Sequence, residues 1–333
     1  MSAPDVGRCA SCGAQLGPGL VVCPACHRLV HAERLNVLAA QAATAEKSGD
    51  MGAALSAWRG AAELLPRGST QAAQVDAQID RLSRLVDGPG GAQPGKKGNA
   101  AAATGIGAVV LMALSKGKFL LAGLTKLPTL LSMFVAFGAY WALWGWRFAL
   151  GFVVSIYVHE MGHVAALRRY GISATAPMFI PGLGAFVRLN QRPANAREDA
   201  TVGLAGPVWG TGAALVCLAV AKGLDAPLWL ALAHVGAWIN LFNLLPLFTL
   251  DGGRAFVALS RGFRFIVAGV LAVGWLVTGE GMLMLIAGVA TWRAFNRDAP
   301  QQGDVPTVVT YSVVVALLCG VLLLSAGAVP GAS

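Results

Sequence analysis

Charged residues are scarce in this chain. Of its 333 residues only 12% are Asp, Glu, Lys or Arg, whereas 56% are hydrophobic. An ordinary soluble domain carries about 25% charged residues. So little charge could not keep this much apolar surface in water, and the composition excludes a disordered chain and argues against a wholly soluble protein. It predicts instead an integral membrane protein with a soluble part.

Acidic residues are rarer than basic ones. The chain has 16 Asp and Glu and 25 Lys and Arg, which gives a formal net charge of +9. On a soluble domain this surplus would suggest nucleic acid, but in a membrane protein it more often marks cytoplasmic loops. Residues 1–100 hold 10 basic and 8 acidic residues, whereas residues 101–333 hold 15 and 8. Most of the surplus thus lies in the apolar part, and no nucleic-acid partner is expected.

An apolar core segment is lacking in Met1–Gly19 as well, so no export signal and a reducing compartment are expected. Four of the six cysteines form two Cys-x2-Cys pairs, a spacing that favours a tetrahedral zinc ion. Disulfides or idle thiols are the alternative, which a reducing compartment disfavours. His27 and His31 lie nearby but are not needed as ligands. The predicted ligands of this structural zinc ion are Cys9, Cys12, Cys23 and Cys26.

Residues 31–86 show helical spacing of apolar residues, interrupted at Gly49 and Pro66. The pattern resembles about one tetratricopeptide repeat, with Ala54, Trp58, Ala61 and Pro66 in its signature places. A small alanine-rich helical bundle is the alternative. Either arrangement would serve protein contact, and a cytosolic protein partner of this N-terminal head is expected.

Long apolar runs follow a Gly- and Pro-rich linker. The segment 104–127 is interrupted by three lysines and is expected at the membrane surface, with a full span as the alternative. Two later runs, separated by Gly279–Gly281, are short and could form a tight hairpin. The predicted spans are 129–146, 148–168, 201–221, 227–247, 264–279, 281–295 and 306–327.

The basic residues predict the orientation of these spans. With seven spans and the head in the cytoplasm, 13 of the 15 basic residues of the membrane part lie on the cytoplasmic side, and only Arg147 and Lys222 lie outside. The expectations of no export signal and of reduced cysteines agree with this orientation. The C-terminus would then lie outside.

The second predicted span contains His-Glu-Met-Gly-His at residues 159–163. Histidines four residues apart share one helix face and can ligate one zinc ion, while Glu160 can act as general base towards water. Ionisable residues within a span are costly and usually mark function, although polar residues that merely pair with other helices are the alternative. His159 lies nine residues before Arg168, which places it about 13 Å inside the span and requires a water path from the cytoplasmic side.

A catalytic zinc ion needs a third protein ligand and an open position. Asp251 is the best candidate, because it follows a helix end broken by Pro246 and precedes Gly252 and Gly253, which allow close backbone approach. An interfacial carboxylate near Arg254 is the alternative. The predicted metal ligands are therefore His159, His163 and Asp251.

The two motifs together, H-E-x-x-H in one membrane helix and N-x-x-P-x-x-x-L-D-G-G in a later one, resemble the site-2 protease family of intramembrane zinc metalloproteases over roughly residues 129–260. The resemblance implies that Glu160 activates water and that Asn243 lies near the active site, where it could steady a substrate carbonyl. It also implies the three zinc ligands His159, His163 and Asp251.

Other positions agree with the family or depart from it. Gly206-Pro207 resembles a further element of the family. Many members carry Asn where this chain has Gly210, and members often carry further prolines where it has Phe248 and Thr249. These departures do not touch the implied ligands. No PDZ or CBS-like domain is evident.

Sequence and resemblance together predict a zinc metalloendopeptidase that hydrolyses peptide bonds within or next to transmembrane segments, in regulated intramembrane proteolysis. Its expected partners are a single-span or membrane-anchored protein substrate and membrane lipid. A catalytically idle scaffold and a metal transporter are the alternatives. The intact Glu160 disfavours a scaffold, and the lack of further intramembrane carboxylates disfavours a transporter. A bacterial cytoplasmic (inner) membrane is the expected location.

Two other features carry expectations. The segment 172–189 is too broken by Pro and Gly for a spanning helix and predicts short strands or a re-entrant loop. It could offer an edge strand to an extended substrate or simply cap the site. His234 is expected to make a helix-packing hydrogen bond.

The expected fold is mainly α, a polytopic helical membrane protein of about six to seven spans with a small soluble head. One catalytic and one structural zinc ion are expected. The predicted domains are a zinc ribbon at 1–30, tetratricopeptide-like helices at 31–86, a flexible linker at 87–103, a membrane-surface segment at 104–128, a catalytic core at 129–260 and additional transmembrane helices at 261–333.

Overall fold

The computed structural model describes residues 7–87, 127–173, 178–180, 184–186, 191, 193–247 and 250–326. The fold is mainly helical, as predicted, and the chain divides into two compact units. The first unit holds the chain up to Lys97 together with Arg168–Ser173, and the second holds Gly98–Leu167 and Ala174–Ser333. Most of the predicted linker and the predicted surface segment up to residue 126 lie outside the described residues.

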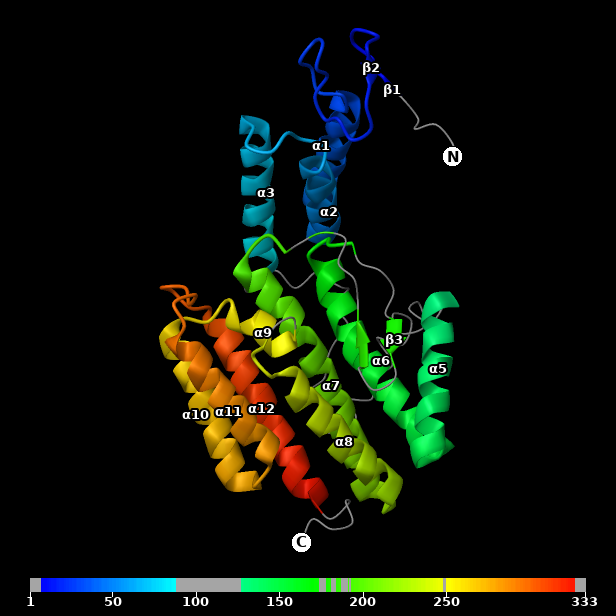
Figure 1. Cartoon of the computed structure of the whole chain (residues 1–333), viewed down its shortest axis with the longest axis vertical. Helices are drawn as coiled ribbons and strands as arrows, with labels where there is room; N and C mark the ends of the chain where they lie inside the picture. Colours follow the sequence, from blue (N-terminus) through cyan, green and yellow to red (C-terminus); the bar gives the residue numbers. More distant parts are fainter. Residues whose placement is uncertain are drawn as a thin grey trace. The chain divides into compact units, whose positions relative to one another are not determined.

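In the first unit, three helices follow the cysteine-bearing turns within residues 7–87 (Figure 1). Helix α1 packs against α2, and α2 packs against α3. Gly49, with a φ of +79°, provides the turn after α1, and the Asp50 carboxylate caps α2 by accepting a hydrogen bond from the Ala53 amide at 3.0 Å. Helices α1 and α2 therefore form a helix–turn–helix, an arrangement that a small helical bundle and a tetratricopeptide-like pair share. The bounds are α1 Ala32–Lys47, α2 Met51–Ala62 and α3 Thr70–Asp87.

The segment Arg168–Ser173 is an integral part of this first unit. Tyr170 is fully buried, and Arg59 donates a hydrogen bond from Nε to its carbonyl at 3.2 Å. The Tyr170 hydroxyl donates to the Asp87 carboxylate. Side-chain and backbone contacts from α2 and α3 thus hold this segment.

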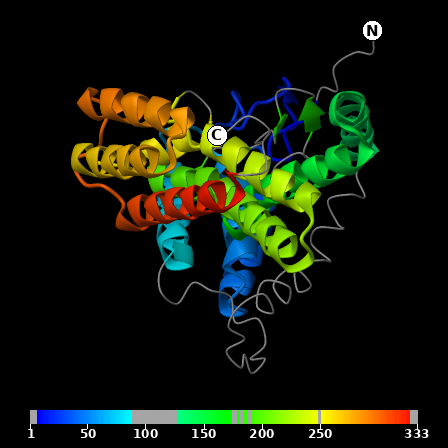
Figure 2. The same ribbon diagram turned by 90° about the horizontal axis from the view of Figure 1, so that it is seen from below.

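The described residues of the second unit form long helices, one short helix and one hairpin (Figures 1 and 2). Helix α7 packs against α8 and α9, whereas α10, α11 and α12 lie side by side and α12 also contacts α7 and α8. The last two residues of α6 belong to the first unit. The bounds are α5 Leu127–Trp144, α6 Trp146–Arg169, α7 Ala196–Leu224, α8 Pro227–Asn243, α9 Asp251–Phe256, α10 Arg261–Thr278, α11 Gly281–Phe295 and α12 Val305–Ser325.

Each of the seven predicted spans coincides with a helix, and two differ clearly in their ends. Helix α7 begins at Ala196 rather than at residue 201, because Asn195 caps it by accepting a hydrogen bond from the Glu198 amide at 2.9 Å. Its first turn is polar, so a search for apolar runs misses it. Helix α8 ends at Asn243 rather than at residue 247, because Pro246 disfavours helical backbone just before it.

Four described helices are long and apolar enough to cross a membrane: α6, α7, α10 and α12. In α5–α8 and α10–α12, Glu160 is the one Asp, Glu, Lys or Arg residue that lies more than four residues from a helix end. Burying a charge in the middle of a span is costly, and these helices avoid it everywhere else. The length, apolarity and charge placement of the helices are those of an integral membrane protein.

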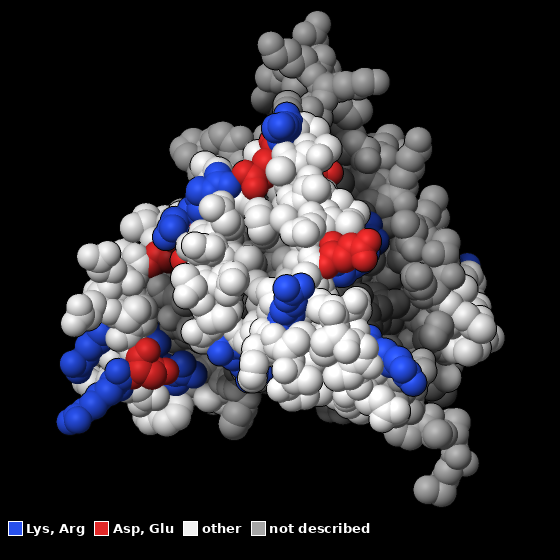
Figure 3. Space-filling model, turned by 90° about the horizontal axis from the view of Figure 1, so that it is seen from above, with Lys and Arg blue, Asp and Glu red and all other residues white. Residues whose placement is uncertain are grey.

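Ion pairs join several charged helix ends of the second unit. Arg197 at the start of α7 lies 3.4 Å from the Asp304 carboxylate at the start of α12. Arg264 near the start of α10 and Arg293 near the end of α11 both pair with the Asp298 carboxylate, at 2.7 and 2.9 Å. Figure 3 shows acidic side chains beside several of the basic ones on the face that it draws. The starts of α7, α10 and α12 and the end of α11 therefore bear paired charges.

The predicted strands are present as a hairpin. Strand β3 (Met178–Ile180) pairs antiparallel with β4 (Gly184–Phe186), with Phe179 opposite Ala185. The Phe179 ring is buried and stacks on Tyr157 of α6, and its amide donates to the Ser132 hydroxyl of α5 at 3.1 Å. The hairpin is thus held against both helices.

Two arginines hold the short helix α9 in place, one within the helix and one in α10. Six residues make too few hydrogen bonds to be a stable helix alone. Arg264 is fully buried, donates to the carbonyls of Phe256 and Leu259 at 3.0 and 3.1 Å, and pairs with Asp298 at 2.7 Å. Arg254 pairs with Asp199 of α7 at 2.7 Å. These contacts fix the helix whose first residue is Asp251.

Candidate metal centres

Helix α6 carries the first part of the candidate catalytic site. His159 and His163 lie one turn apart, and their Nε2 atoms are 3.2 Å from each other. Both rings are buried, with 5% and 7% of the residue exposed, and Glu160 between them is 6% exposed. The helix thus buries three ionisable groups at the depth where its other residues are apolar.

Asp251 completes the cluster from the start of α9. Its Oδ2 lies 3.1 Å from Nε2 of His159, and its Oδ1 lies 3.3 Å from Nε2 of His163. The backbone leaves α8 at Asn243, passes Pro246 and begins α9 at Asp251, which returns the carboxylate to the histidines. The three predicted ligands are therefore brought together, although 88 residues of sequence separate Asp251 from His163.

The hydrogen bond at Nδ1 of each histidine ring determines which ring nitrogen has a lone pair that can bind a metal ion. The Nδ1 of His163 lies 2.8 Å from the Val202 carbonyl, which can only accept, so Nδ1 carries the proton. The Nδ1 of His159 lies 2.9 Å from Oδ1 of Asn240. Both Nε2 atoms then present lone pairs to the Asp251 carboxylate, an arrangement that repels unless a cation lies between them.

The spacing of these atoms fits a tetrahedral zinc ion. Nitrogen and oxygen ligands lie 2.0–2.2 Å from zinc, so two ligands on a tetrahedron are about 3.3 Å apart. The three measured separations among His159, His163 and Asp251 are 3.1, 3.2 and 3.3 Å. Three protein ligands leave one position open, which is the composition of a catalytic rather than a structural zinc site.

Glycines let neighbouring backbones reach this site. A Cβ at Gly206 of α7 would lie 2.2 Å from Nε2 of His163 and 2.5 Å from Nε2 of His159. At Gly162 of α6 it would lie 2.4 Å from the Ala205 carbonyl oxygen. These separations are too short for any side chain, so α6 and α7 approach as closely as they do because both positions are glycine.

The second cluster lies in the turns of two short hairpins of the first unit. β1 (Gly7–Arg8) pairs with β2 (Gln15–Leu16), and Val22 bridges Leu29. One Cys-x2-Cys pair occupies each turn, and both turns have the same hydrogen-bond pattern. Cys9 N donates to Ala14 O and Cys23 N to Arg28 O, each at 2.9 Å.

The sulfur atoms of these two turns converge. Cys9 and Cys26 are 3.8 Å apart at Sγ, and Cys12 and Cys23 are 3.7 Å apart. Thiolates 2.3 Å from a tetrahedral zinc ion would be about 3.8 Å apart, so the four residues fit a closed site. The amide N–H groups of Ser11 and Cys12 lower the pKa of the Cys9 thiol to about 6, which favours the thiolate form.

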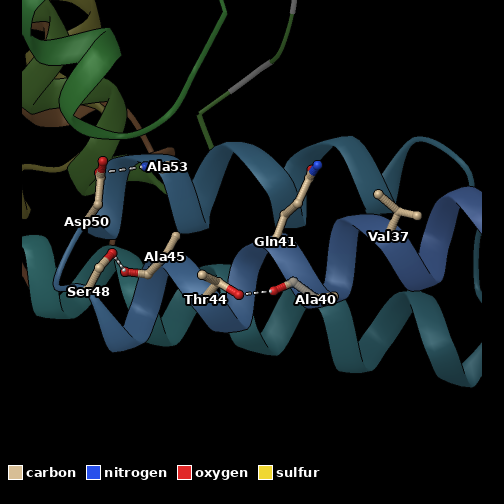
Figure 4. A pocket seen from close by; sticks show the side chains of 8 residues that line it. All are labelled: Val37, Ala40, Gln41, Thr44, Ala45, Ser48, Asp50 and Ala53. Carbon is tan, nitrogen blue, oxygen red and sulfur yellow. Dashed lines mark hydrogen bonds between the residues drawn. The ribbon is translucent and has the colours of Figure 1, made fainter.

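A shallow hollow in the first unit has no such chemistry. It lies along α1 and the start of α2, and two of its hydroxyls, those of Thr44 and Ser48, donate to carbonyls of their own helix at 2.9 Å (Figure 4). The hollow therefore offers mainly apolar surface. Its lining consists of Val37, Ala40, Gln41, Thr44, Ala45, Ser48, Asp50 and Ala53.

The remaining predicted residues have simpler surroundings. Asn243 is half-buried at the end of α8, and its side chain makes no hydrogen bond within the described part of the chain, so its proposed role stays a prediction. His234 lies 3.0 Å from the Ser325 hydroxyl of α12, which is the helix-packing contact expected for it.

Sequence reasoning missed Asn240 and the Val202 carbonyl. A backbone carbonyl leaves no signal in a sequence. Asn240 does, because a polar amide in an otherwise apolar span is costly unless it is paired, and this one has 1% of its surface exposed.

The fold and the site together define a class: a helical membrane protein with a candidate metal centre of two histidines and one carboxylate and with a glutamic acid beside it. Comparison with known proteins agrees. Residues 147–226, which include both histidines and Glu160, match the family described as Peptidase family M50. The resemblance to site-2 proteases is thereby confirmed.

The chain is also similar to zinc metalloprotease MJ0392 of Methanocaldococcus jannaschii. The two are 28% identical over 152 residues, which are 44% of this chain and 43% of that protein. The match thus spans less than half the length of this relative. No solved structure matches the chain.

Proposed function

We propose that this protein is a zinc metalloendopeptidase that cuts membrane-anchored proteins within or next to their transmembrane segments. The observation that carries the proposal is the convergence of His159, His163 and Asp251, with Glu160 buried next to a ligand, on helices of membrane type. The similarity to a zinc metalloprotease and to family M50 supports the same chemistry.

The proposed reaction is hydrolysis. When bound, zinc lowers the pKa of water towards about 7 and polarises a carbonyl oxygen. Glu160 takes one proton from the attacking water and returns it to the nitrogen of the leaving amine as the carbon–nitrogen bond breaks. The Asn240 and Val202 contacts keep both imidazoles in one orientation during these steps. The helices around the site bury Glu160 and Asp251 and so exclude bulk water from these two carboxyl groups.

The basic helix ends support an orientation for this reaction. We place the ends that bear Arg197, Arg264 and Arg293 at the cytoplasmic face, because basic residues are retained there. The N-terminal head would then lie in the cytoplasm, and a bacterial cytoplasmic membrane is the proposed location. A cytosolic protein is the proposed partner of the head.

The zinc ribbon is tested by metal analysis of the full chain. Replacing Cys9 and Cys12 together by Ser removes two of four thiolates and is expected to lower the zinc content by one ion per chain. Cleavage should be retained if the catalytic centre binds its own ion. An unchanged zinc content in this double variant would contradict the ribbon.

An extended substrate could add to the hairpin as a further strand. The Phe179 amide points away from β4 to Ser132, so the pair Phe179–Ala185 makes no hydrogen bond across the hairpin. The Ala185 amide then points away from β3, and the outer edge of β4 pairs with no other strand among the described residues. We propose this edge as the one that receives the substrate.

Replacing Ala185 by Pro tests that edge. Proline removes the outward N–H but no hydrogen bond of the hairpin, and edge strands tolerate it. One lost hydrogen bond of about 1 kcal/mol corresponds to an approximately five-fold fall in kcat/KM for a membrane substrate. Ala185→Val retains the amide and is the matched control. Equal kcat/KM values for both variants would exclude this edge.

The proposed function is tested with the purified protein in lipid vesicles that contain a single-span substrate. Cleavage products are analysed by mass spectrometry, and zinc is removed and restored. The expected result is a zinc-dependent cut inside or beside the span. A protein that binds zinc but leaves every such substrate intact would contradict the proposal.

A further inference from the structure

Asn240 is a buried polar residue that contacts the candidate metal centre, and the proposed reaction does not need it as ligand or base. It lies near the end of α8 with 1% of its surface exposed. An amide at that depth is costly unless its donors and its acceptor are used. Its contacts therefore indicate a role beyond helix packing.

Two contacts fix the orientation of the Asn240 amide. Its Nδ2 lies 2.7 Å from the carbonyl oxygen of Gly236, one turn earlier in α8. A carbonyl can only accept, so the NH2 group must face it and the oxygen must face the other way. That oxygen lies 2.9 Å from Nδ1 of His159.

The orientation of the amide determines the tautomer of the ring. Because Oδ1 can only accept, Nδ1 of His159 must carry the proton, and Nε2 keeps its lone pair. That lone pair faces His163 and the Asp251 carboxylate at 3.2 and 3.1 Å. At His163 the Val202 carbonyl has the same effect. The tautomer of each ring is thus determined by a different kind of group, a side chain at His159 and a backbone carbonyl at His163.

We propose that Asn240 is a positioning residue that holds His159 in the tautomer and orientation that bind zinc. The inference rests on the proposed metal centre, but not on the identity of any substrate. The hydrogen-bond partner of a metal-binding histidine orients the ring and raises its basicity, and losing it typically lowers metal affinity 10- to 100-fold.

Gly210 of α7 is the structural complement of Asn240. A Cβ at position 210 would lie 2.1 Å from Oδ1 and 2.6 Å from Nδ2 of Asn240, so any side chain there would displace the amide. An asparagine places its own amide oxygen about 2.4 Å from its Cβ. An asparagine at position 210 could therefore put an oxygen close to where Oδ1 of Asn240 now lies, provided that Asn240 is removed.

Zinc affinity is the first readout, measured by competition with a chelator. The full chain with Cys9→Ser and Cys12→Ser serves as background, so that the head binds no metal. Asn240→Leu keeps the volume but cannot accept a hydrogen bond, and it is expected to weaken zinc binding 10- to 100-fold. Asn240→Ala should weaken it to a similar extent.

Restoration by a second substitution separates positioning from packing. Gly210→Asn alone is expected to weaken zinc binding, because the new side chain collides with Asn240. Gly210→Asn combined with Asn240→Ala is expected to regain most of the affinity, because it returns an acceptor to His159. A residue needed only for packing would not be restored in this way.

The tautomer itself is the second readout. Long-range proton–nitrogen spectra of the metal-free protein report which ring nitrogen is protonated. Protonated Nδ1 is expected for His159 in the parent protein and a mixture of tautomers in Asn240→Leu, while His163 stays unchanged as an internal control.

The outcomes separate this inference from the proposed function. Unchanged zinc affinity and an unchanged His159 tautomer in Asn240→Leu would overturn the positioning role. A fall in affinity that Gly210→Asn restores would support it even if the protein cleaved no membrane substrate, because neither readout involves cleavage.

Discussion

Replacing Glu160 by Gln is expected to abolish cleavage while zinc remains bound. Glutamine has the shape of glutamic acid but cannot take a proton from water, and general-base catalysis contributes typically 10²- to 10⁴-fold. Glu160 does not belong to the cluster formed by His159, His163 and Asp251, so its replacement removes none of the three candidate ligands. The rate of cleavage in vesicles should fall by at least about 100-fold, with the zinc content of the chain unchanged.

Metal content and thermal unfolding are the controls for this variant. Glu160 is buried, with 6% of its surface exposed, so these two measurements must show that Glu160→Gln still binds zinc and that α6 is not disturbed. If Glu160→Gln binds zinc, stays folded and cuts the substrate at the original rate, the role of Glu160 as base is wrong.

Replacing Gly206 by Ala is expected to eliminate zinc binding and cleavage together. The added methyl carbon would lie 2.2 Å from Nε2 of His163 and 2.5 Å from Nε2 of His159, which is where the ion must bind. Either the methyl group blocks the ion or α7 moves and loses the Val202 contact to His163. A fall in zinc affinity of at least about 100-fold is expected, since both disturbances affect the ligands directly.

Gly212 provides the matched control in the same helix. A Cβ there meets no atom within 4 Å, so Gly212→Ala should retain zinc and activity. Alanine favours helix over glycine by up to about 1 kcal/mol. If Gly206→Ala binds zinc as tightly as Gly212→Ala, the site does not lie against α7 as described.

Much of the fold follows from the sequence because the helices of the second unit are long and apolar. Composition alone could not predict the residues at which the helices begin and end. The start of α7 depends on the Asn195 cap and a polar first turn, and the end of α8 depends on Pro246. Both ends depend on local features, a polar capped turn and the backbone restriction before proline, and the length of an apolar run reports neither.

The convergence of the three candidate ligands was predictable for a different reason. His159 and His163 share a helix face whatever surrounds them, and a charged Asp251 in an apolar region is conspicuous. The supporting contacts were not predictable, since they depend on how α7 and α8 pack against α6. The contact of the Val202 carbonyl with His163 and the close approach of both histidine rings to Gly206 are known only from the three-dimensional structure.

The most direct test of the central claim is a zinc titration of peptide cleavage. The chain with Cys9→Ser and Cys12→Ser is stripped of metal, placed in vesicles with a single-span substrate, and given increasing zinc while products are measured. The expected result is no cleavage without zinc and a rise that saturates at one zinc ion per chain, with the cut inside or beside the span. Full cleavage by the metal-free protein would contradict the account.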